Sequence, residues 1–236
     1  MSYGYSSTSF TTASQARVDE RAQFIVRTYN HLFGAIVLFT LIEVALFQTG
    51  VAYSLAQAML GTNWLLVMGA FVVVSWLASH VAHSAVSRTS QYLALAGFVA
   101  AEAVIFVPLL VIAQAVAPGA IQSAGIVTIL GFAGLTLVAF RTRKDFSFLR
   151  GVLMWGGIVA LVAIAASVLF GFQLGVWFSV AMIAFAGAAI LYDTSNVLRH
   201  FPTDRHVSAA LQLFSSVALM FWYVLRLFIS SSSSRS

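Results

Sequence analysis

Three acidic residues lie inside long apolar stretches of this chain, and they are its strongest candidates for chemistry. Asp193 ends an uncharged run at 173–192 and is followed at once by three polar residues, whereas Glu43 and Glu102 each lie well inside an apolar run. An ionisable group carried into a bilayer is costly, so it usually has a polar partner or a function. We therefore expect any function to involve these carboxyl groups, and Asp193 first.

The composition predicts an integral membrane protein. Of the 236 residues, 61% are hydrophobic and 8% are charged, whereas a typical soluble domain has about 25% charged residues. The chain has no cysteine, which excludes disulfides, thiolate metal sites and cysteine nucleophiles. The basic residues lie between apolar runs rather than on a polar domain. This placement is typical of membrane proteins, and we expect no binding to nucleic acid.

Seven apolar runs are long enough to cross a membrane, which takes roughly 20 residues. They span about residues 31–51, 63–85, 91–115, 120–140, 148–170, 174–192 and 207–229. Lys and Arg occur before the first run and in every second loop, and the other three loops have none. The positive-inside rule then predicts a cytoplasmic amino terminus. A seventh segment that re-enters without crossing is the alternative for the last run.

The membrane region is expected to be the only folded domain. Residues 1–29 are polar and lack the order of a signal peptide, so they predict a disordered cytoplasmic tail. The membrane domain is expected at 30–229, followed by a short Ser-rich tail at 230–236.

The depth of the three acids suggests different roles. At about 1.5 Å per residue, Glu43 and Glu102 lie roughly 18 Å from the cytoplasmic ends of their helices, near the midplane. Each could line a polar cavity or act as a buried, protonated hydrogen-bond donor. Asp193 lies close to the cytoplasmic face, where the alternative to a functional role is an ion pair with Arg199.

Several classes of membrane protein are excluded or disfavoured by their missing residues. A retinal protein needs a lysine in its last span, but the single lysine of this chain is Lys144, in a loop. The zinc-protease pattern HisGluXXHis and the GlyXSerXGly turn are both absent. A metal site built from Glu43, Glu102, His80 and His83 is conceivable, but their spacing does not establish one. We expect no enzymatic activity and no cofactor.

Three short motifs carry a resemblance to a known family. They are LeuTyrAspThr at 191–194, ThrArgLysAspPheSer at 142–147 and AlaAlaLeuGlnLeuPhe at 209–214. Together with the seven-span layout, they resemble the bacterial branch of the Bax inhibitor-1 family, also called the transmembrane BAX inhibitor motif family. The resemblance extends from Phe24 to Phe228.

The resemblance implies a fold and an activity. Family members are bundles in which the last helix is central, and bacterial examples resemble pH-sensitive calcium leak channels. In these, two aspartates share a proton and gate the cytoplasmic mouth. Asp193 matches the first aspartate, but the second falls on Ser216, because the chain has SerSer at 215–216 where the family has Leu-Asp. Since two close carboxylates are what makes such a switch, pH gating is expected to be weakened or lost.

The sequence offers further candidates for an ion path and for a pH sensor. Ser215, Ser216 and Tyr192 offer neutral oxygens beside the Asp193 carboxylate, although hard cations prefer several oxygens. His80 and His83 are candidates for a substitute pH sensor, because histidine changes charge near neutral pH. The alternative for both histidines is contact with lipid headgroups at the interface.

Two functions follow as hypotheses. The first is passive conduction of a cation, with Ca²⁺ as the expected cargo, across a bacterial inner membrane. The second is a non-conducting, stress-related regulator or substrate of a membrane-anchored ATP-dependent quality-control protease, for which the amino-terminal tail would be the handle. The partners expected are the lipid bilayer and, for the second hypothesis, the protease. The sequence does not predict an oligomeric state.

Overall fold

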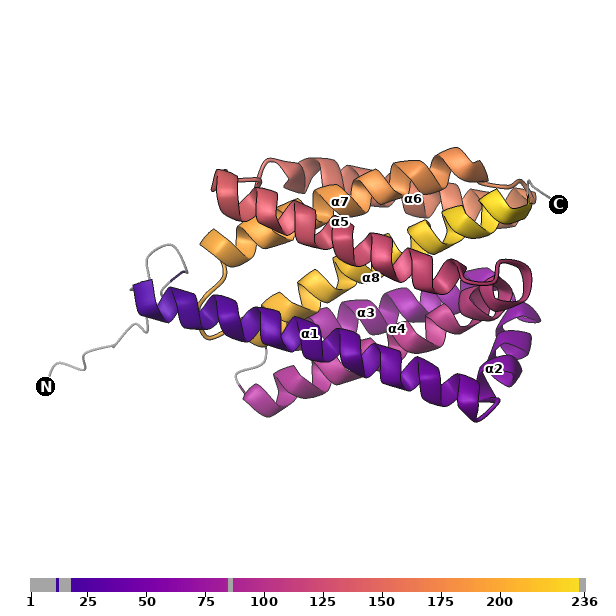
Figure 1. Cartoon of the computed structure of the whole chain (residues 1–236), viewed down its shortest axis with the longest axis horizontal. Helices are drawn as coiled ribbons and strands as arrows, with labels where there is room; N and C mark the ends of the chain where they lie inside the picture. The colour runs from indigo at the N-terminus through magenta and orange to yellow at the C-terminus, as the bar shows by residue number, and fades with distance from the viewer. Residues whose placement is uncertain (1–11, 13–17, 85–86, 234–236) are drawn as a thin grey trace, which may run out of the picture.

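The computed structural model of the protein is a bundle of helices, and it describes residues 12, 18–84 and 87–233 (Figure 1). Within this part of the chain, seven helices are long and apolar enough to cross a membrane, and one shorter helix lies between the first two of them. The helices are α1 (Val18–Gln48), α2 (Val51–Leu60), α3 (Trp64–Ser84), α4 (Arg88–Val116), α5 (Ala120–Thr142), α6 (Leu149–Phe170), α7 (Gly175–Arg199) and α8 (His206–Ser233). The predicted seven-span, multi-pass membrane protein is confirmed.

The last helix occupies the centre of the bundle, as predicted. In Figure 1, α8 crosses the middle of the molecule, and it packs against α1, α3, α4, α5 and α7. Its buried positions include the small residues Ala209, Ala210 and Ala218, which let neighbouring helices approach closely. Together with α8, α4 is the most deeply buried helix. The core is therefore built on two helices rather than on one.

The first helix starts earlier than predicted, and the boundary of the expected tail is wrong. Residues 18–29 fall within the tail predicted at 1–29, but α1 begins at Val18. Asp19 and Glu20 lie in its first turn, where negative charge is favoured by the helix dipole. Phe24 and Thr28 are buried, so this segment also packs on the bundle.

At the carboxyl end, too, the helix extends into the predicted tail. Of the amino-terminal tail, residues 1–11 and 13–17 lie outside the described part of the chain. At the other end, α8 continues to Ser233, so most of the expected Ser-rich tail is helical, and residues 234–236 lie outside the described part. Ser230 and Ser231 donate to the carbonyls of Arg226 and Leu227 one turn earlier, which allows serines to continue a helix.

The short helix α2 was not predicted. It follows Gly50, which has a φ of 76°, a left-handed conformation that only glycine adopts without strain. The chain therefore turns sharply at the end of α1. On α2, Ala52 and Ala56 are buried against Val107 of α4. The connection between the first two spans is thus part of the packed bundle.

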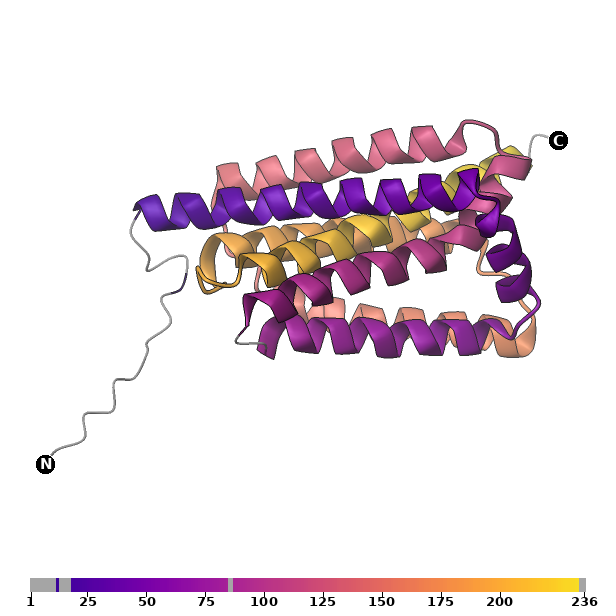
Figure 2. The same ribbon diagram turned by 90° about the horizontal axis from the view of Figure 1, so that it is seen from below.

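Basic residues gather at one end of the bundle. The start of α1 and the α3–α4, α5–α6 and α7–α8 connections lie at the same end in both views (Figures 1 and 2). Every described Lys or Arg except Arg226 belongs to this end, called here the amino-terminal end: Arg21, Arg27, Arg88, Arg141, Arg143, Lys144, Arg150, Arg199 and Arg205. By the positive-inside rule, we expect this end to face the cytoplasm.

The expected orientation can be tested cleanly because the chain contains no cysteine. Ser87→Cys lies at the amino-terminal end and Thr62→Cys in the α2–α3 connection at the opposite end, and both positions are exposed. In intact cells, a membrane-impermeant maleimide should label Thr62→Cys and should label Ser87→Cys only after permeabilisation. The reverse pattern would invert the orientation, and equal labelling of both would contradict the span count.

Candidate functional site

Asp193 lies in the interior between α7 and α8, with 4% of its surface exposed. Two side chains of α8 hold its carboxylate. Gln212 Nε2 donates to Asp193 Oδ1 at 2.5 Å, and Ser216 Oγ donates to Asp193 Oδ2 at 2.5 Å. Each carboxylate oxygen therefore has one neutral donor, which is the minimum needed to offset its removal from water. These three residues are called the Asp193 cluster below.

The spacing on α8 explains why these two residues reach the same carboxylate. Gln212 and Ser216 are four residues apart, so they lie one above the other on one helical face. Ser216 was a predicted site residue, and the structure places it on Asp193. Gln212 was missed, although its position one turn before Ser216 was the available signal.

The alternative of an ion pair with Arg199 does not occur in the structure. The Arg199 guanidinium instead donates to the main-chain carbonyl of Arg143. The ion pairs of the described residues involve Asp145 and Asp204, and neither contains Asp193. Asp193 points into the bundle six residues before the end of α7, whereas the Arg199 guanidinium reaches the α5–α6 connection.

The α5–α6 connection is fastened to α7 just beyond Asp193. The Phe146 main-chain N–H donates to Ser195 Oγ at 3.0 Å, and His200 Nε2 lies 3.5 Å from Asp145 Oδ2. The Ser147 main-chain N–H donates to Asp145 Oδ1 at 2.9 Å and lowers the pKa of Asp145. The contribution of Asp145 to stability is thus present above its ordinary pKa and is lost as the pH falls through the lowered value. The motif at 142–147 serves to dock this loop.

Two other predicted path residues lie beside the Asp193 cluster without joining its hydrogen bonds. Ser215 is half-buried and, at about 100° per residue, lies about 100° around α8 from Ser216. Tyr192 is half-buried and lines a surface pocket of about 360 Å³ together with Arg150 and Asn196.

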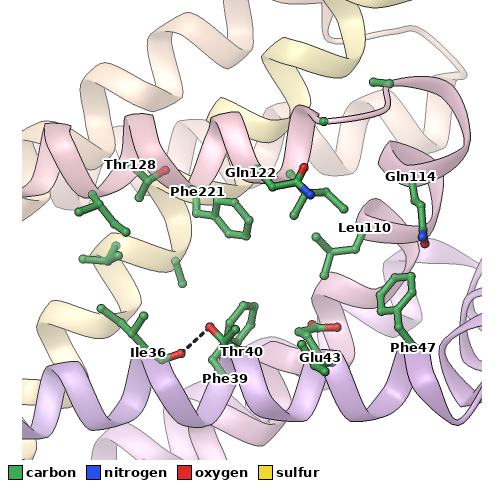
Figure 3. Close-up of a pocket in the computed structure, with 18 of the residues that line it drawn as sticks. Ile36, Phe39, Thr40, Glu43, Phe47, Leu110, Gln114, Gln122, Thr128 and Phe221 are labelled. Atoms are coloured by element: carbon green, nitrogen blue, oxygen red, sulfur yellow. Dashed lines mark hydrogen bonds between the residues drawn. The ribbon is translucent and has the colours of Figure 1, made fainter.

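Glu43 lines a much larger cavity, whereas Glu102 does not. The cavity has a volume of about 570 Å³ and lies between α1, α4, α5 and α8. Figure 3 shows Glu43 on its α1 wall, opposite Gln122 of α5. Glu102 is buried in α4 but is not among the residues that line this cavity. The two midplane acids therefore do not share a common cavity.

The predicted histidines lie away from Asp193, and a different pair was missed. His80 is exposed on α3 and stacks on Trp76, with ring centroids 5.5 Å apart. The side chain of His83 lies outside the described part of the structure. At the amino-terminal end, His31 of α1 meets Tyr92 of α4 at 3.0 Å and the His206 ring of α8 at 4.9 Å between centroids. His31 and His206 are 175 residues apart in the chain, so sequence spacing gave no signal.

The sequence profile of the family described as inhibitor of apoptosis-promoting Bax1 matches residues 21–233. The chain belongs to the Bax inhibitor-1 family. The resemblance inferred from the three motifs is therefore confirmed, and the match includes all of the helices described here except the first residues of α1.

Individual relatives match over shorter stretches. An uncharacterized protein of Pseudomonas aeruginosa is 36% identical over 111 residues, which cover 46% of this chain and 49% of that protein. YccA of Escherichia coli K12, named a modulator of FtsH protease, is 32% identical over 105 residues, covering 41% and 48%. Protein LIFEGUARD 4 of Arabidopsis thaliana is 31% identical over 116 residues, covering 46% of each chain. The chain spans about half the length of the curated relatives it matches.

Removal of the Ser216 hydroxyl should destabilise this Bax inhibitor-1 protein. Ser216→Ala leaves Asp193 Oδ2 buried without its donor, which costs about 1–3 kcal/mol. The free energy of unfolding in detergent micelles, measured by titration with a denaturing detergent, should fall by this amount. Ser215→Ala is the matched control and should change it by less than about 0.5 kcal/mol. Equal effects of the two substitutions would show that the hydrogen bond to Asp193 does not contribute.

Proposed function

We propose that this protein conducts a cation passively across the membrane, with Ca²⁺ as the cargo and the Asp193 cluster as the cytoplasmic mouth of the path. The observation that supports the proposal is a buried carboxylate held only by neutral side chains. If a Lys or Arg side chain were paired with this carboxylate, it would have to be displaced before a cation could bind. Gln212 and Ser216 instead bring oxygen atoms that can themselves turn toward a cation.

The Asp193 cluster contains one carboxylate, and this affects how the proposed cation flux should depend on pH. Where two carboxylates meet, they share a proton, and the pH decides whether they repel each other. Here Ser216 occupies the second place and donates to Asp193. We therefore propose a leak that depends on Asp193 but responds little to cytoplasmic pH.

Opening of the path requires movement between α7 and α8. Asp193 is buried, and both of its donors come from α8, so a cation reaches the carboxylate only when these helices separate or rotate. The motion has to break two hydrogen bonds, whose loss the arriving cation offsets. The proposal assigns no catalytic residue and no cofactor, and places the protein in a bacterial inner membrane with a cytoplasmic amino terminus.

Asp193→Asn should reduce Ca²⁺ flux into liposomes that contain the purified protein by about tenfold or more, because it removes the charge that would attract the cation while keeping the size of the side chain. Flux is read from a Ca²⁺ indicator enclosed in the liposomes and is measured from pH 6 to pH 8. Wild-type flux should vary little over this range.

Ser216→Asp tests whether a second carboxylate at this position restores pH dependence. It creates a second carboxylate at the position that contacts Asp193, so its flux should become dependent on pH. Ser215→Asp adds the same charge one residue earlier, about 100° around α8 from Ser216, and should not create this dependence. If wild-type liposomes take up no more Ca²⁺ than empty ones at any pH, the conduction proposal fails.

A second candidate function is regulation of a membrane-anchored ATP-dependent protease. It is supported by the match to YccA, which is named a modulator of FtsH protease. That match covers 41% of this chain, so a shared activity is a proposal. Under this proposal the protease engages the polar segment that precedes α1.

Deletion of residues 2–16 should lengthen the half-life of the protein at least about twofold in cells that contain the protease, because the proposed handle is lost. Half-life is measured by pulse–chase in cells with and without the protease. Replacement of the same segment by a Gly/Ser sequence of equal length tests whether the chain needs only a flexible handle. An unchanged half-life together with no recovered complex would contradict this function.

A further inference from the structure

The cavity beside Glu43 is a pocket in the side of the bundle, and some of its lining residues, such as Gln122 and Ile129, are exposed. Its walls come from α1, α4, α5 and α8, and the α4–α5 turn closes one end. That turn depends on Gly119, whose φ of 83° favours glycine. The volume of about 570 Å³ falls in the range of roughly 300–1,000 Å³ that is usual for small-molecule sites.

Polar atoms beside this cavity lack the partners that buried groups normally have. Both carboxyl oxygens of Glu43 are buried without a hydrogen-bond partner, and so is Thr128 Oγ1. The Glu43 side chain is 7% exposed, and Figure 3 shows it extending from α1 toward the cavity. Thr40, another polar residue of the walls, does have a partner, since it donates to the Ile36 carbonyl at 2.9 Å. Buried groups without partners are rare and require an explanation.

The charge of the walls selects a cationic ligand. Glu43 is the one ionisable side chain among the described residues that line the cavity, and they include no Lys, Arg or His. An anion or a phosphate group would therefore meet a carboxylate and no basic partner. A phospholipid headgroup in the cavity would likewise bring its phosphate next to Glu43.

The remaining walls select an organic cation over a metal ion. Most of the lining is apolar and includes the rings of Phe39, Phe47, Phe214 and Phe221. Aromatic faces attract cations, and they do so best when water is excluded. A hard dication such as Ca²⁺ takes six to eight oxygen ligands, which a wall of this composition does not supply around Glu43.

We propose that this cavity binds a lipophilic organic cation, with its ammonium or phosphonium centre beside Glu43 and its apolar body against the phenylalanine rings. The inference is independent of ion conduction. At about 100° per residue, Val217 and Phe221, which line the cavity, lie on the face of α8 opposite to Gln212 and Ser216. The two sites therefore use different sides of the same helix.

Binding of radiolabelled tetraphenylphosphonium to the purified full-length protein in a neutral detergent tests this proposal. Wild type should bind the cation saturably at one site per chain. Glu43→Gln removes the charge at nearly constant volume and should weaken binding by about tenfold or more. Glu102→Gln neutralises a buried acid outside the cavity and should bind as wild type does. Tetraphenylborate, an anion of nearly the same shape, should not bind at this site.

A second variant tests the cavity without altering Glu43. A Cβ atom at Gly125 of α5 would meet nothing within 4 Å, and Gly125 lines the cavity. Gly125→Leu should therefore fill the space, abolish phosphonium binding and preserve or raise the thermal unfolding midpoint, because leucine also favours helix. Equal binding by wild type and Glu43→Gln, equal binding of the borate, or unchanged binding by Gly125→Leu would each overturn the proposal, whatever the Ca²⁺ flux.

Discussion

The hydrogen bonds from Gln212 and Ser216 to Asp193 fix how α7 meets α8, and much of the bundle is arranged around that contact. In hydrocarbon no water replaces a missing partner, so each buried polar group has to be satisfied from within the protein. The carboxylate thereby selects one rotation of α8 about its axis. Because α8 also packs against α1, α3, α4 and α5, this rotation determines which residues it presents to all of them.

The central helix carries two different surfaces. The face toward Asp193 is polar and closely paired, whereas the face toward α1 and α5 is apolar and borders an open volume. The hydrogen bonds to Asp193 hold α8 on one side, and the cavity on the other side leaves space into which α8 can shift. The small buried residues Ala209, Ala210 and Ala218 let it slide with few interlocking side chains.

The sequence was sufficient for properties that depend on composition and length. Seven long apolar runs predicted the spans, and the motifs singled out Asp193 and Ser216, which are hydrogen-bonded to each other in the structure. Contacts between distant segments were not predictable, because nothing in the sequence showed that His31 would meet His206 or that Phe146 would reach Ser195. The start of α1 was misjudged because a polar composition was read as disorder, although its packing depends on the single apolar face that carries Phe24.

The docking of the α5–α6 connection on Ser195 has a mechanical consequence. Ser195 lies two residues beyond Asp193 on α7, and it accepts the hydrogen bond from the main chain of Phe146. A displacement of α7 large enough to uncover the acid must either drag this connection along or break that bond. The hydrogen bond between Phe146 and Ser195 therefore adds to the free energy needed to move α7 and expose the carboxylate. Through this bond, movement of α7 is coupled to α5 and α6.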